Sequence, residues 1–317
     1  MTAADGPIVV TGVAGFIGSN LAERLLADGW HVVGVDDLSQ GVIEQVPAEV
    51  DFHELDIRDP ELHRLIRGAA AIFHLAARNC VSDCELAPVE TASVNVVGTV
   101  NVLEAAVRAG VERVIYAESS ALYEGTDRFP TPEEVHAPRS VYATSKAAAR
   151  AFAMGFGRAR GLALTALRYF CVYGPRQDYR RTLPPVMTAF ILRLLQGQQP
   201  TIFGTGEKRR DFVYVDDVND FHVRCLADGR TAGGTFNLGA GRDHSVAEIF
   251  ALVARLLDSN VEPLWAPDLP GEAERTCADI GAARALGWEP KVPLEEGIRR
   301  SIDYIRAHVL DSTAGAA

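Results

Sequence analysis

Residues 7–29 read PIVVTGVAGFIGSNLAERLLADG, and this stretch decides the fold. Its first five residues are an apolar, β-branched run that predicts a buried strand, and the residues from Ser19 onward have helical spacing. Gly12, Gly15 and Gly18 lie between the two. Gly12 can form a tight turn, Gly15 lets the backbone approach a pyrophosphate, and Gly18 lets the helix pack closely on a sheet. We therefore predict a strand, a glycine-rich turn and a helix whose N-terminus faces phosphate groups.

The rest of the first half alternates short apolar runs with longer helical patterns. The predicted strands are PIVVT (7–11), HVVGVD (31–36), VDFHEL (50–55), AAIFHL (70–75), ERVIYA (112–117) and an apolar strand over 162–169. The predicted helices are 16–28, 60–67, 88–109 and one that begins near Ser140. Parallel strands need crossover connections of this length. The pattern therefore predicts an α/β fold with a Rossmann-like, doubly wound parallel sheet.

The character of the sequence changes after Gly174. Prolines then cluster at positions 175, 184, 185 and 200, and glycines at 197, 204 and 206. We expect residues 1–173 to form the dinucleotide-binding domain, with some later segments returning to it. Residues 174–310 are expected to form mainly a smaller α/β lobe that binds the substrate, and 311–317 a tail.

An acidic residue at the end of the second predicted strand indicates which dinucleotide is bound. Asp36 lies 18 residues after Gly18, where a carboxylate can bind ribose hydroxyls. Asp37, Leu38 and Ser39 follow, without an arginine that could receive a 2′-phosphate. NAD is therefore favoured over NADP, and a flavin or S-adenosylmethionine is the alternative ligand of the same turn.

Composition restricts the class of protein. Hydrophobic residues make up 48% of the chain and charged residues 23%, as in globular proteins, and the apolar runs are too short to span a bilayer. The N-terminus lacks the pattern of a secretion signal, so we expect a cytoplasmic protein without a membrane partner. A net charge of −11 disfavours nucleic acid as a partner. The five cysteines are an odd number without a second Cys/His pair near Cys80 and Cys84, so reduced thiols and no metal site are expected.

Eight motifs together resemble the extended short-chain dehydrogenase/reductases that act on nucleotide sugars. They are TGVAGFIGSNL, VDDLSQG, HLAA, SSALY, YATSK, LRYFCVYGPRQ, GEKRRDFVYVDDV and FNLGAG. They stand in the family's order and cover nearly the whole chain. The resemblance implies NAD as the cofactor and a nucleotide-diphosphate sugar, UDP-linked, as the substrate. It also implies a homodimer that pairs through helices 88–109 and 140–158, whose apolar residues could equally be intrachain core.

The redox chemistry is expected at Tyr142-Ala-Thr-Ser-Lys146, because residues four apart share one face of a helix. Oxidation of an alcohol needs a base at the hydroxyl and a hydride acceptor at the carbon. Tyrosine titrates near 10, so we expect the Lys146 ammonium and a cationic nicotinamide to favour its phenolate. By resemblance, Lys146 also holds the nicotinamide ribose and Ser119 bonds the reacting sugar oxygen.

The resemblance also implies a set of cofactor contacts. Asp56 and Ile57 are expected beside adenine, and Leu75-Ala76-Ala77 beside the ribose and nicotinamide. Asn95 is expected to tie neighbouring backbone, although it could be a structural cap, and the apolar residues could be core alone. The full predicted set is Gly12, Gly15, Phe16, Ile17, Gly18, Asp36, Asp37, Asp56, Ile57, Leu75, Ala76, Ala77, Asn95, Tyr142, Lys146 and Tyr169.

The residues after Ser119 favour one reaction. Dehydratases of this family carry acids there, typically Asp-Glu, and decarboxylases of uronic acid sugars commonly have glutamate at the second position. This chain has Ser120 and Ala121, which cannot exchange a proton as a carboxyl group does. Glu118 should point away, since strand residues alternate. A C4 epimerisation through a transient 4-keto sugar is therefore predicted. The alternatives are a decarboxylase or 4,6-dehydratase of the same family, or a non-catalytic NAD-binding module.

The substrate contacts are predicted less directly. The candidate residues are Ser119, Ser120, Cys171, Arg176, Phe203, Arg210 and Arg275. Arginines suit phosphate oxygens. Many relatives have asparagine where Cys171 stands. Epimerases of glucuronate commonly have an arginine seven residues later, where this chain has Asp178. UDP-hexose and UDP-hexuronate both stay open, because Arg176, Arg180 and Arg181 could meet a carboxylate in another geometry.

Overall fold

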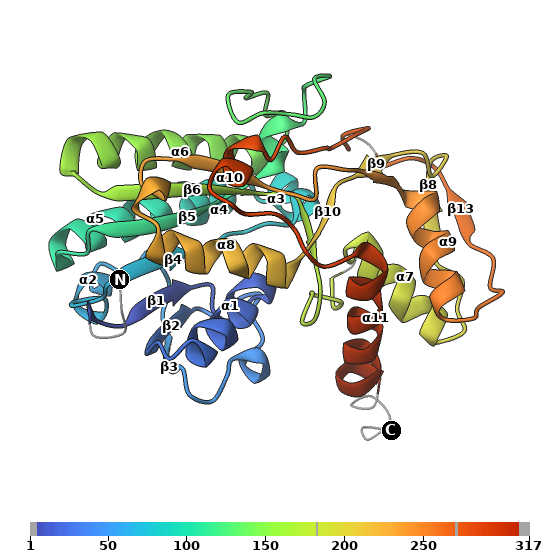
Figure 1. The fold of residues 1–317 in the computed structure, drawn as a ribbon, viewed down its shortest axis with the longest axis horizontal. Coiled ribbons are helices and arrows are strands. Elements are labelled where there is room, and N and C mark those ends of the chain that lie inside the picture. The colour runs from blue at the N-terminus through green and yellow to red at the C-terminus, as the bar shows by residue number, and fades with distance from the viewer. Residues whose placement is uncertain (1–4, 182, 270–271, 311–317) are drawn as a thin grey trace.

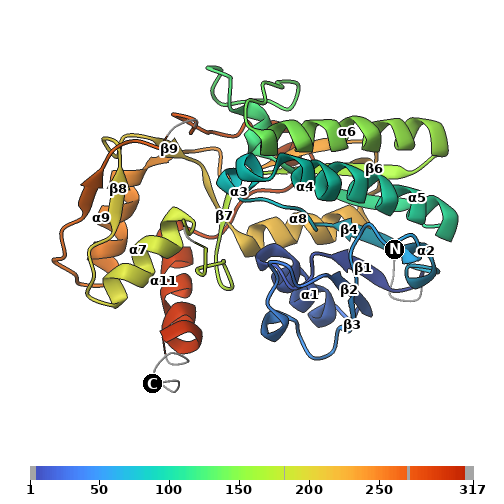
Figure 2. The same cartoon turned by 180° about the vertical axis from the view of Figure 1, so that it is seen from behind.

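A parallel sheet forms the centre of the computed structural model, which describes residues 5–181, 183–269 and 272–310 (Figures 1 and 2). Within these residues the sheet has seven strands in the order β11-β6-β5-β4-β1-β2-β3. Their bounds are β1 Ile8–Thr11, β2 Val32–Asp36, β3 Asp51–Glu54, β4 Ala71–His74, β5 Arg113–Ser119, β6 Ala163–Tyr169 and β11 Thr235–Leu238. The strand order reverses between β1 and β4, which confirms the predicted doubly wound fold. A ligand crevice is expected where such a sheet reverses, at the carboxyl ends of its strands.

Helices cover both faces of the sheet because its strands are apolar on both sides. The helices over the two faces are α1 Phe16–Ala27 and α8 Val215–Ala227 on one, and α2 Leu62–Leu65, α5 Thr99–Ala109 and α6 Val141–Arg160 on the other. Val10 of β1 packs in a core with Leu21 and Phe221, whereas its neighbour Val9 packs with Val102 on the opposite face. Alternate residues of one strand therefore fix helices to both faces.

A second lobe lies beside the carboxyl ends of the strands (Figures 1 and 2). Its helices are α7 Val186–Leu195, α9 Val246–Leu256 and α11 Leu294–Ile305, which share one apolar core. Its strands form three pairs: β7 Cys171–Tyr173 with β10 Phe212–Tyr214, β8 Thr201–Phe203 with β13 Leu264–Ala266, and β9 Arg209–Arg210 with β12 His244–Ser245. The late elements β11 and α8 return to the large sheet, so the chain crosses between the lobes repeatedly.

The helical prediction for 88–109 is confirmed, with an irregularity. This stretch consists of α4 Pro88–Ala92, a π-helical segment Ser93–Gly98 and α5. The helix predicted over 60–67 is shorter, at α2, and the helix α3 Val81–Leu86 was not predicted. The predicted tail 311–317 lies outside the described residues.

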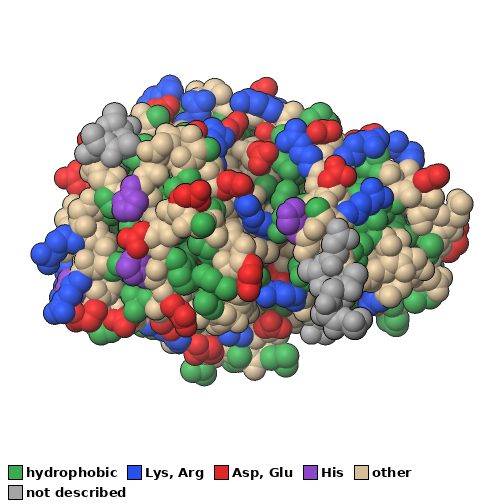
Figure 3. All heavy atoms as spheres, turned by 90° about the horizontal axis from the view of Figure 1, so that it is seen from below, with side chains coloured by type: hydrophobic (Ala, Val, Ile, Leu, Met, Phe, Trp, Pro, Cys, Tyr) green, Lys and Arg blue, Asp and Glu red, His purple; other side chains and the backbone are tan. Residues whose placement is uncertain are grey.

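Charged side chains of both signs are interspersed over the face seen in Figure 3, with apolar side chains between them. Among the described residues, no helix is both long and apolar enough to cross a bilayer.

Candidate active site

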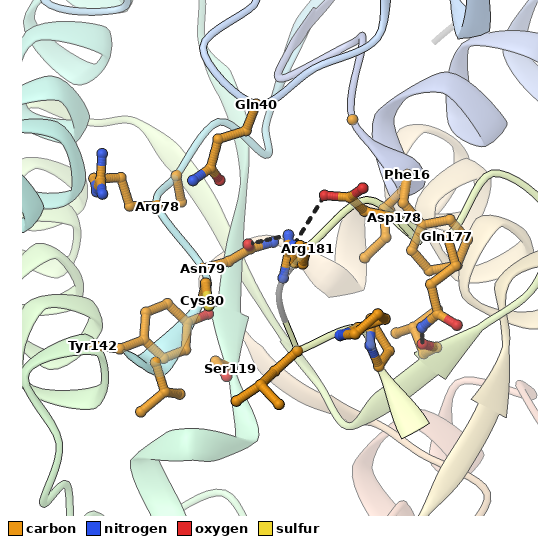
Figure 4. A pocket seen from close by; sticks show the side chains of 18 of the residues that line it. Phe16, Gln40, Arg78, Asn79, Cys80, Ser119, Tyr142, Gln177, Asp178 and Arg181 are labelled. Carbon is orange, nitrogen blue, oxygen red and sulfur yellow. Dashed lines mark hydrogen bonds and ion pairs between the residues drawn. The ribbon is translucent and has the colours of Figure 1, made fainter. Parts of the chain in front are cut away.

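A cavity of about 1220 Å³ opens between the carboxyl ends of the strands and the second lobe. The sheet side of its lining includes the glycine turn, the ends of β2 and β4, and Ser119, Tyr142 and Lys146. The second lobe contributes Phe203 and Arg210. The fold thus brings most of the predicted cofactor residues and the catalytic set into one space. Figure 4 shows Phe16, Ser119 and Tyr142 at this cavity.

The glycine turn has the shape that a dinucleotide pyrophosphate requires. Gly12 has a φ of 74°, and a Cβ there would lie 2.7 Å from the Ala76 nitrogen. A Cβ at Gly18 would lie 2.1 Å from the Gly12 carbonyl oxygen, so only glycine allows α1 to approach this closely. Among the described side chains none caps the first turn of α1. Its N–H groups and its dipole are therefore directed at the cavity that Gly15 and Ile17 line.

Asp36 is positioned by the same turn. Its carboxylate accepts the N–H of Ala14 at 3.0 Å and the N–H of Leu38 at 2.9 Å. Burial raises the pKa of Asp36, and these two hydrogen bonds oppose that increase. Asp37 lines the cavity next to it. The fixed acid at the end of β2 fits the ribose end of NAD.

The loops after β3 and after β4 also line the cavity. Asp56 is held by Arg58, whose guanidinium lowers the pKa of this carboxyl, and Ile57 lies beside it. The loop residues in the lining are Leu75, Ala76 and Ala77. Asn95 stands behind the lining, where it bonds both the N–H and the carbonyl of Arg78 at 2.8 and 2.9 Å. Its amide also donates to the Ser145 hydroxyl, so it ties this loop to α6.

Tyr142 lies in the first turn of α6, and local capping fixes that turn. Ser140 precedes the helix and accepts the N–H of Ala143 at 3.0 Å, while Glu124 accepts both the N–H and the hydroxyl of Ser140. Lys146 follows one turn later on the same face, and both side chains are buried. Ser119 ends β5, where its hydroxyl accepts the N–H of Ala121 at 3.1 Å and acts to lower the pKa of Tyr142.

Burial dominates the electrostatics of this pair. It raises the pKa of Tyr142 to about 12, opposed by the Ser119 hydrogen bond and by the charge of Arg181. It lowers the pKa of Lys146 to about 8, opposed by the charge of Glu118 and by Cys84. Desolvation sets the direction of the shift at Tyr142, and the expected help from the Lys146 ammonium together with a cationic nicotinamide stays a prediction. Both groups are thus shifted toward their neutral forms.

The second lobe places two cations on the far wall of the cavity. Arg210 is mostly buried and faces Glu272 at 3.5 Å. Lys208 was not predicted, although it stands two residues before Arg210 in the same run of basic residues. Its ammonium lies 2.5 Å from Asp268 and 3.5 Å from Glu272. Cys171 lines the same region, and burial raises the pKa of its thiol to about 11, so the thiol is neutral.

Residues 175–181, which we call the strap, cross from the second lobe to the sheet side of the cavity. Asn20 of α1 donates to the Pro175 carbonyl, and Arg176 pairs with Glu23 at 2.7 Å. Arg180 donates to the Gln40 carbonyl at 3.0 Å. Arg181 donates to the Asn79 side chain at 2.6 Å and pairs with Asp178 at 3.0 Å (Figure 4).

Some predicted residues lie elsewhere. Arg275 is outside the lining of the cavity, where its guanidinium pairs with Asp243 at 2.5 Å and covers the ring of Phe129. Ser120 also lies outside the lining. Tyr169 lines the cavity, and its hydroxyl bonds His222 at 2.6 Å.

Comparisons with known proteins agree with this geometry. The model of the NAD dependent epimerase/dehydratase family matches residues 8–239. A UDP-glucose 4-epimerase of Mycolicibacterium smegmatis is 40% identical over 309 residues, which cover 94% of this chain and 98% of that protein. The crystal structure of a UDP-glucose 4-epimerase from Thermotoga maritima with UDP-glucose superposes with a TM-score of 0.91 at 37% identity, covering 95% of this chain and 99% of that one. The Thermus thermophilus UDP-glucose 4-epimerase with NAD has a TM-score of 0.88 at 36% identity, covering 96% and 100%. The chain belongs to the NAD dependent epimerase/dehydratase family.

Proposed function

We propose that this protein uses NAD to epimerise C4 of a UDP-linked sugar through a transient 4-keto sugar. The observation that carries the proposal is one cavity that joins a dinucleotide turn to Ser119, Tyr142 and Lys146, with Ser120 and Ala121 following the serine. Glu118, the nearest acid in sequence, is turned into the protein and pairs with Arg168 at 2.7 Å. The site therefore offers a base for a hydroxyl, without the carboxyl acids that elimination of water requires.

Each member of the catalytic set has a distinct task. The glycine turn, Asp36 and Lys146 would hold NAD, which would supply a hydride acceptor for the sugar carbon. Tyr142 removes the proton of the C4 hydroxyl and gives it back, and Ser119 bonds the same oxygen. Because burial raises the pKa of Tyr142 to about 12, the phenolate needs cationic help from Lys146 and Arg181. Lys146 also holds the nicotinamide ribose.

The second lobe supports a nucleotide-diphosphate sugar as the substrate. Arg210 and Lys208 present positive charge on the cavity wall, where a diphosphate can pair with them. The names of the relatives support UDP as the nucleotide. Cys171 offers a weaker hydrogen bond than an amide, so its neutral thiol makes room for the sugar rather than anchoring it. Residues 174–310 thus supply most of the substrate contacts.

Product analysis tests the reaction. Purified protein is incubated with UDP-glucose, UDP-N-acetylglucosamine, UDP-glucuronate and their GDP and dTDP counterparts, and products are identified by proton NMR and mass spectrometry. We expect C4 epimers without net consumption of added NAD. A lasting keto product or carbon dioxide would instead identify a dehydratase or a decarboxylase.

A variant tests the assignment of the base. Tyr142→Phe keeps the buried ring and removes the hydroxyl, so we expect kcat to fall by about 10²–10⁴-fold with the fold and NAD content retained. Tyr214→Phe is the matched control, since this buried tyrosine of the second lobe lies outside the lining of the cavity. Unchanged turnover in Tyr142→Phe would show that Tyr142 is not the base.

We further propose a cytoplasmic homodimer. Five large apolar side chains are exposed on α3, α4, the π-helical segment and α6: Val81, Leu86, Val89, Val97 and Phe152. Pairing these helices with a second copy would bury these side chains.

Phe152→Glu should convert a dimer to a monomer in light scattering, whereas Leu264→Glu, on an equally exposed residue of the second lobe, should not. A monomeric wild type would refute the dimer, and cell fractionation checks the location.

A further inference from the structure

Strand β5 and helix α6 present two matching rows of side chains to each other. Tyr116 and Glu118 lie two residues apart on β5, and Lys146 and Arg150 lie four residues apart on α6. The Lys146 ammonium stands 4.8 Å from the centre of the Tyr116 ring. One turn further, the Arg150 guanidinium lies 2.8 Å from the Glu118 carboxylate.

The Glu118 carboxylate is completely enclosed. Its second oxygen accepts a hydrogen bond from Arg168 of β6 at 2.7 Å, and neither side chain is exposed. Arg168 in turn donates to the Glu133 carbonyl at 3.0 Å and contacts the His136 ring nitrogen at 3.0 Å. A buried charge persists only when it is paired, and a sealed carboxylate one residue before Ser119 is costly without a role that needs its charge.

We propose that Glu118 is a positioning residue: its carboxylate anchors Arg150 and Arg168 behind the active site and keeps the Lys146 ammonium protonated. This inference rests on the proposed function of Lys146 in the catalytic set. It adds an acid whose side chain is closed to solvent, although the residue borders the cavity, and which acts through the lysine.

The groups that face Lys146 identify Glu118 as the relevant anion. They come from four elements: Tyr142 and Arg150 of α6, Tyr116 and Glu118 of β5, His74 of β4 and Cys84 of α3. Burial lowers the pKa of His74 to about 3 and raises the pKa values of Tyr116, Tyr142 and Cys84, so these four are neutral near pH 7. Glu118 therefore supplies the negative charge, while Arg150 and Arg168, which pair with the same carboxylate, are like charges of the ammonium.

NMR can read the protonation of Lys146 directly, because the chain has three lysines, Lys146, Lys208 and Lys291. Protein labelled with ¹³C and ¹⁵N in lysine is titrated, and Lys146→Met assigns the signal. In Glu118→Gln we expect the midpoint of Lys146 to fall by about one to two pH units. In the matched variant Arg150→Gln we expect it to rise, because a repelling charge is removed. Lys208 and Lys291 serve as internal references.

The opposite signs separate this proposal from a structural role. A loosened helix would disturb both variants in the same direction. The alkaline limb of the kcat profile should move with the NMR midpoint, to lower pH in Glu118→Gln and to higher pH in Arg150→Gln. An unchanged Lys146 midpoint in Glu118→Gln, or a shift of the same sign in both variants, would overturn the proposal. If Glu118→Gln does not fold, a failure of Arg150→Gln to raise the midpoint overturns it. The NMR readout needs no substrate, so it remains decisive if the epimerase assignment itself fails.

Discussion

Tyr142 meets two opposing requirements. It must be buried to exclude water from a redox site, yet burial raises the pKa of its phenol to about 12 and so disfavours the base it has to become. The Ser119 hydroxyl and the cations Lys146 and Arg181 favour the phenolate form of Tyr142. None of these acts alone, because Lys146 itself is shifted toward neutrality by the same burial. The arrangement makes the site dependent on charge supplied from further away.

At Asp36 we predict a specific loss of NAD affinity. Asp36→Asn replaces one of the two oxygens that hold the Ala14 and Leu38 N–H groups, and it removes the negative charge next to the ribose. We expect NAD to bind about tenfold more weakly, corresponding to about 1–2 kcal/mol. Calorimetry on protein freed of NAD measures this. Asp51→Asn is the matched control, because this exposed carboxylate at the start of β3 lies outside the lining of the cavity, and equal affinities of the two variants would contradict the prediction.

Among the elements, the sequence predicted those whose residues are determined mainly by burial or by backbone geometry. The buried parallel strands read as continuous apolar runs, so β1, β2, β4, β5 and β6 appear within a few residues of their predicted bounds. The glycine turn was also predictable, because close backbone contacts at positions 12 and 18 require glycine. These features depend on local sequence and on burial alone.

Contacts between distant segments were not predictable in the same way. The position of Lys208 at the cavity depends on the contact between its segment, next to β9, and the loop after β13. Arg275 lies outside the cavity and pairs with Asp243, 32 residues earlier in the chain. The strap likewise owes its role to Gln40 and Asn79, far from it in sequence. Side-chain partners of this kind depend on the tertiary arrangement, which composition and periodicity do not encode.

The strap should control how fast NAD is exchanged. Arg180 and Arg181 connect the second lobe to the loops after β2 and β4, which flank the cofactor side of the cavity. Replacing both by glutamine removes these ties, so we expect NAD to dissociate at least about fivefold faster, since a kcal/mol of lost tethering corresponds to that factor. Stopped-flow displacement of NAD gives the rate. Arg255→Gln, which removes a surface pair with Glu295, should leave the rate unchanged. A rate equal to that of the wild type in the double variant would show that the strap does not retain NAD.

At the scale of the whole molecule, buried histidines link its stability to pH. Burial lowers the pKa of His74 and of His222 to about 3, whereas a histidine in the unfolded chain titrates near 6.5. Both rings lie in the sheet domain, where His74 bonds Thr11 and His222 bonds Tyr169. Above pH 6.5 both states hold neutral rings and the full stability is present. As the pH falls below 6.5 the unfolded chain binds two protons that the folded protein cannot accept.

We therefore predict acid sensitivity with a defined size. Between pH 7 and pH 5 these two rings should lower the free energy of unfolding by about 4 kcal/mol, in addition to the effect of the carboxylates. Urea unfolding followed by circular dichroism at a series of pH values measures the slope of the free energy of unfolding against pH. His74→Gln with His222→Gln should flatten it, at some loss of stability at pH 7 from the altered hydrogen bonds, whereas His31→Gln, on an exposed histidine, should not. The same slope in the double variant and the wild type would mean that the folded protein protonates these rings, and that the sheet opens around them in acid.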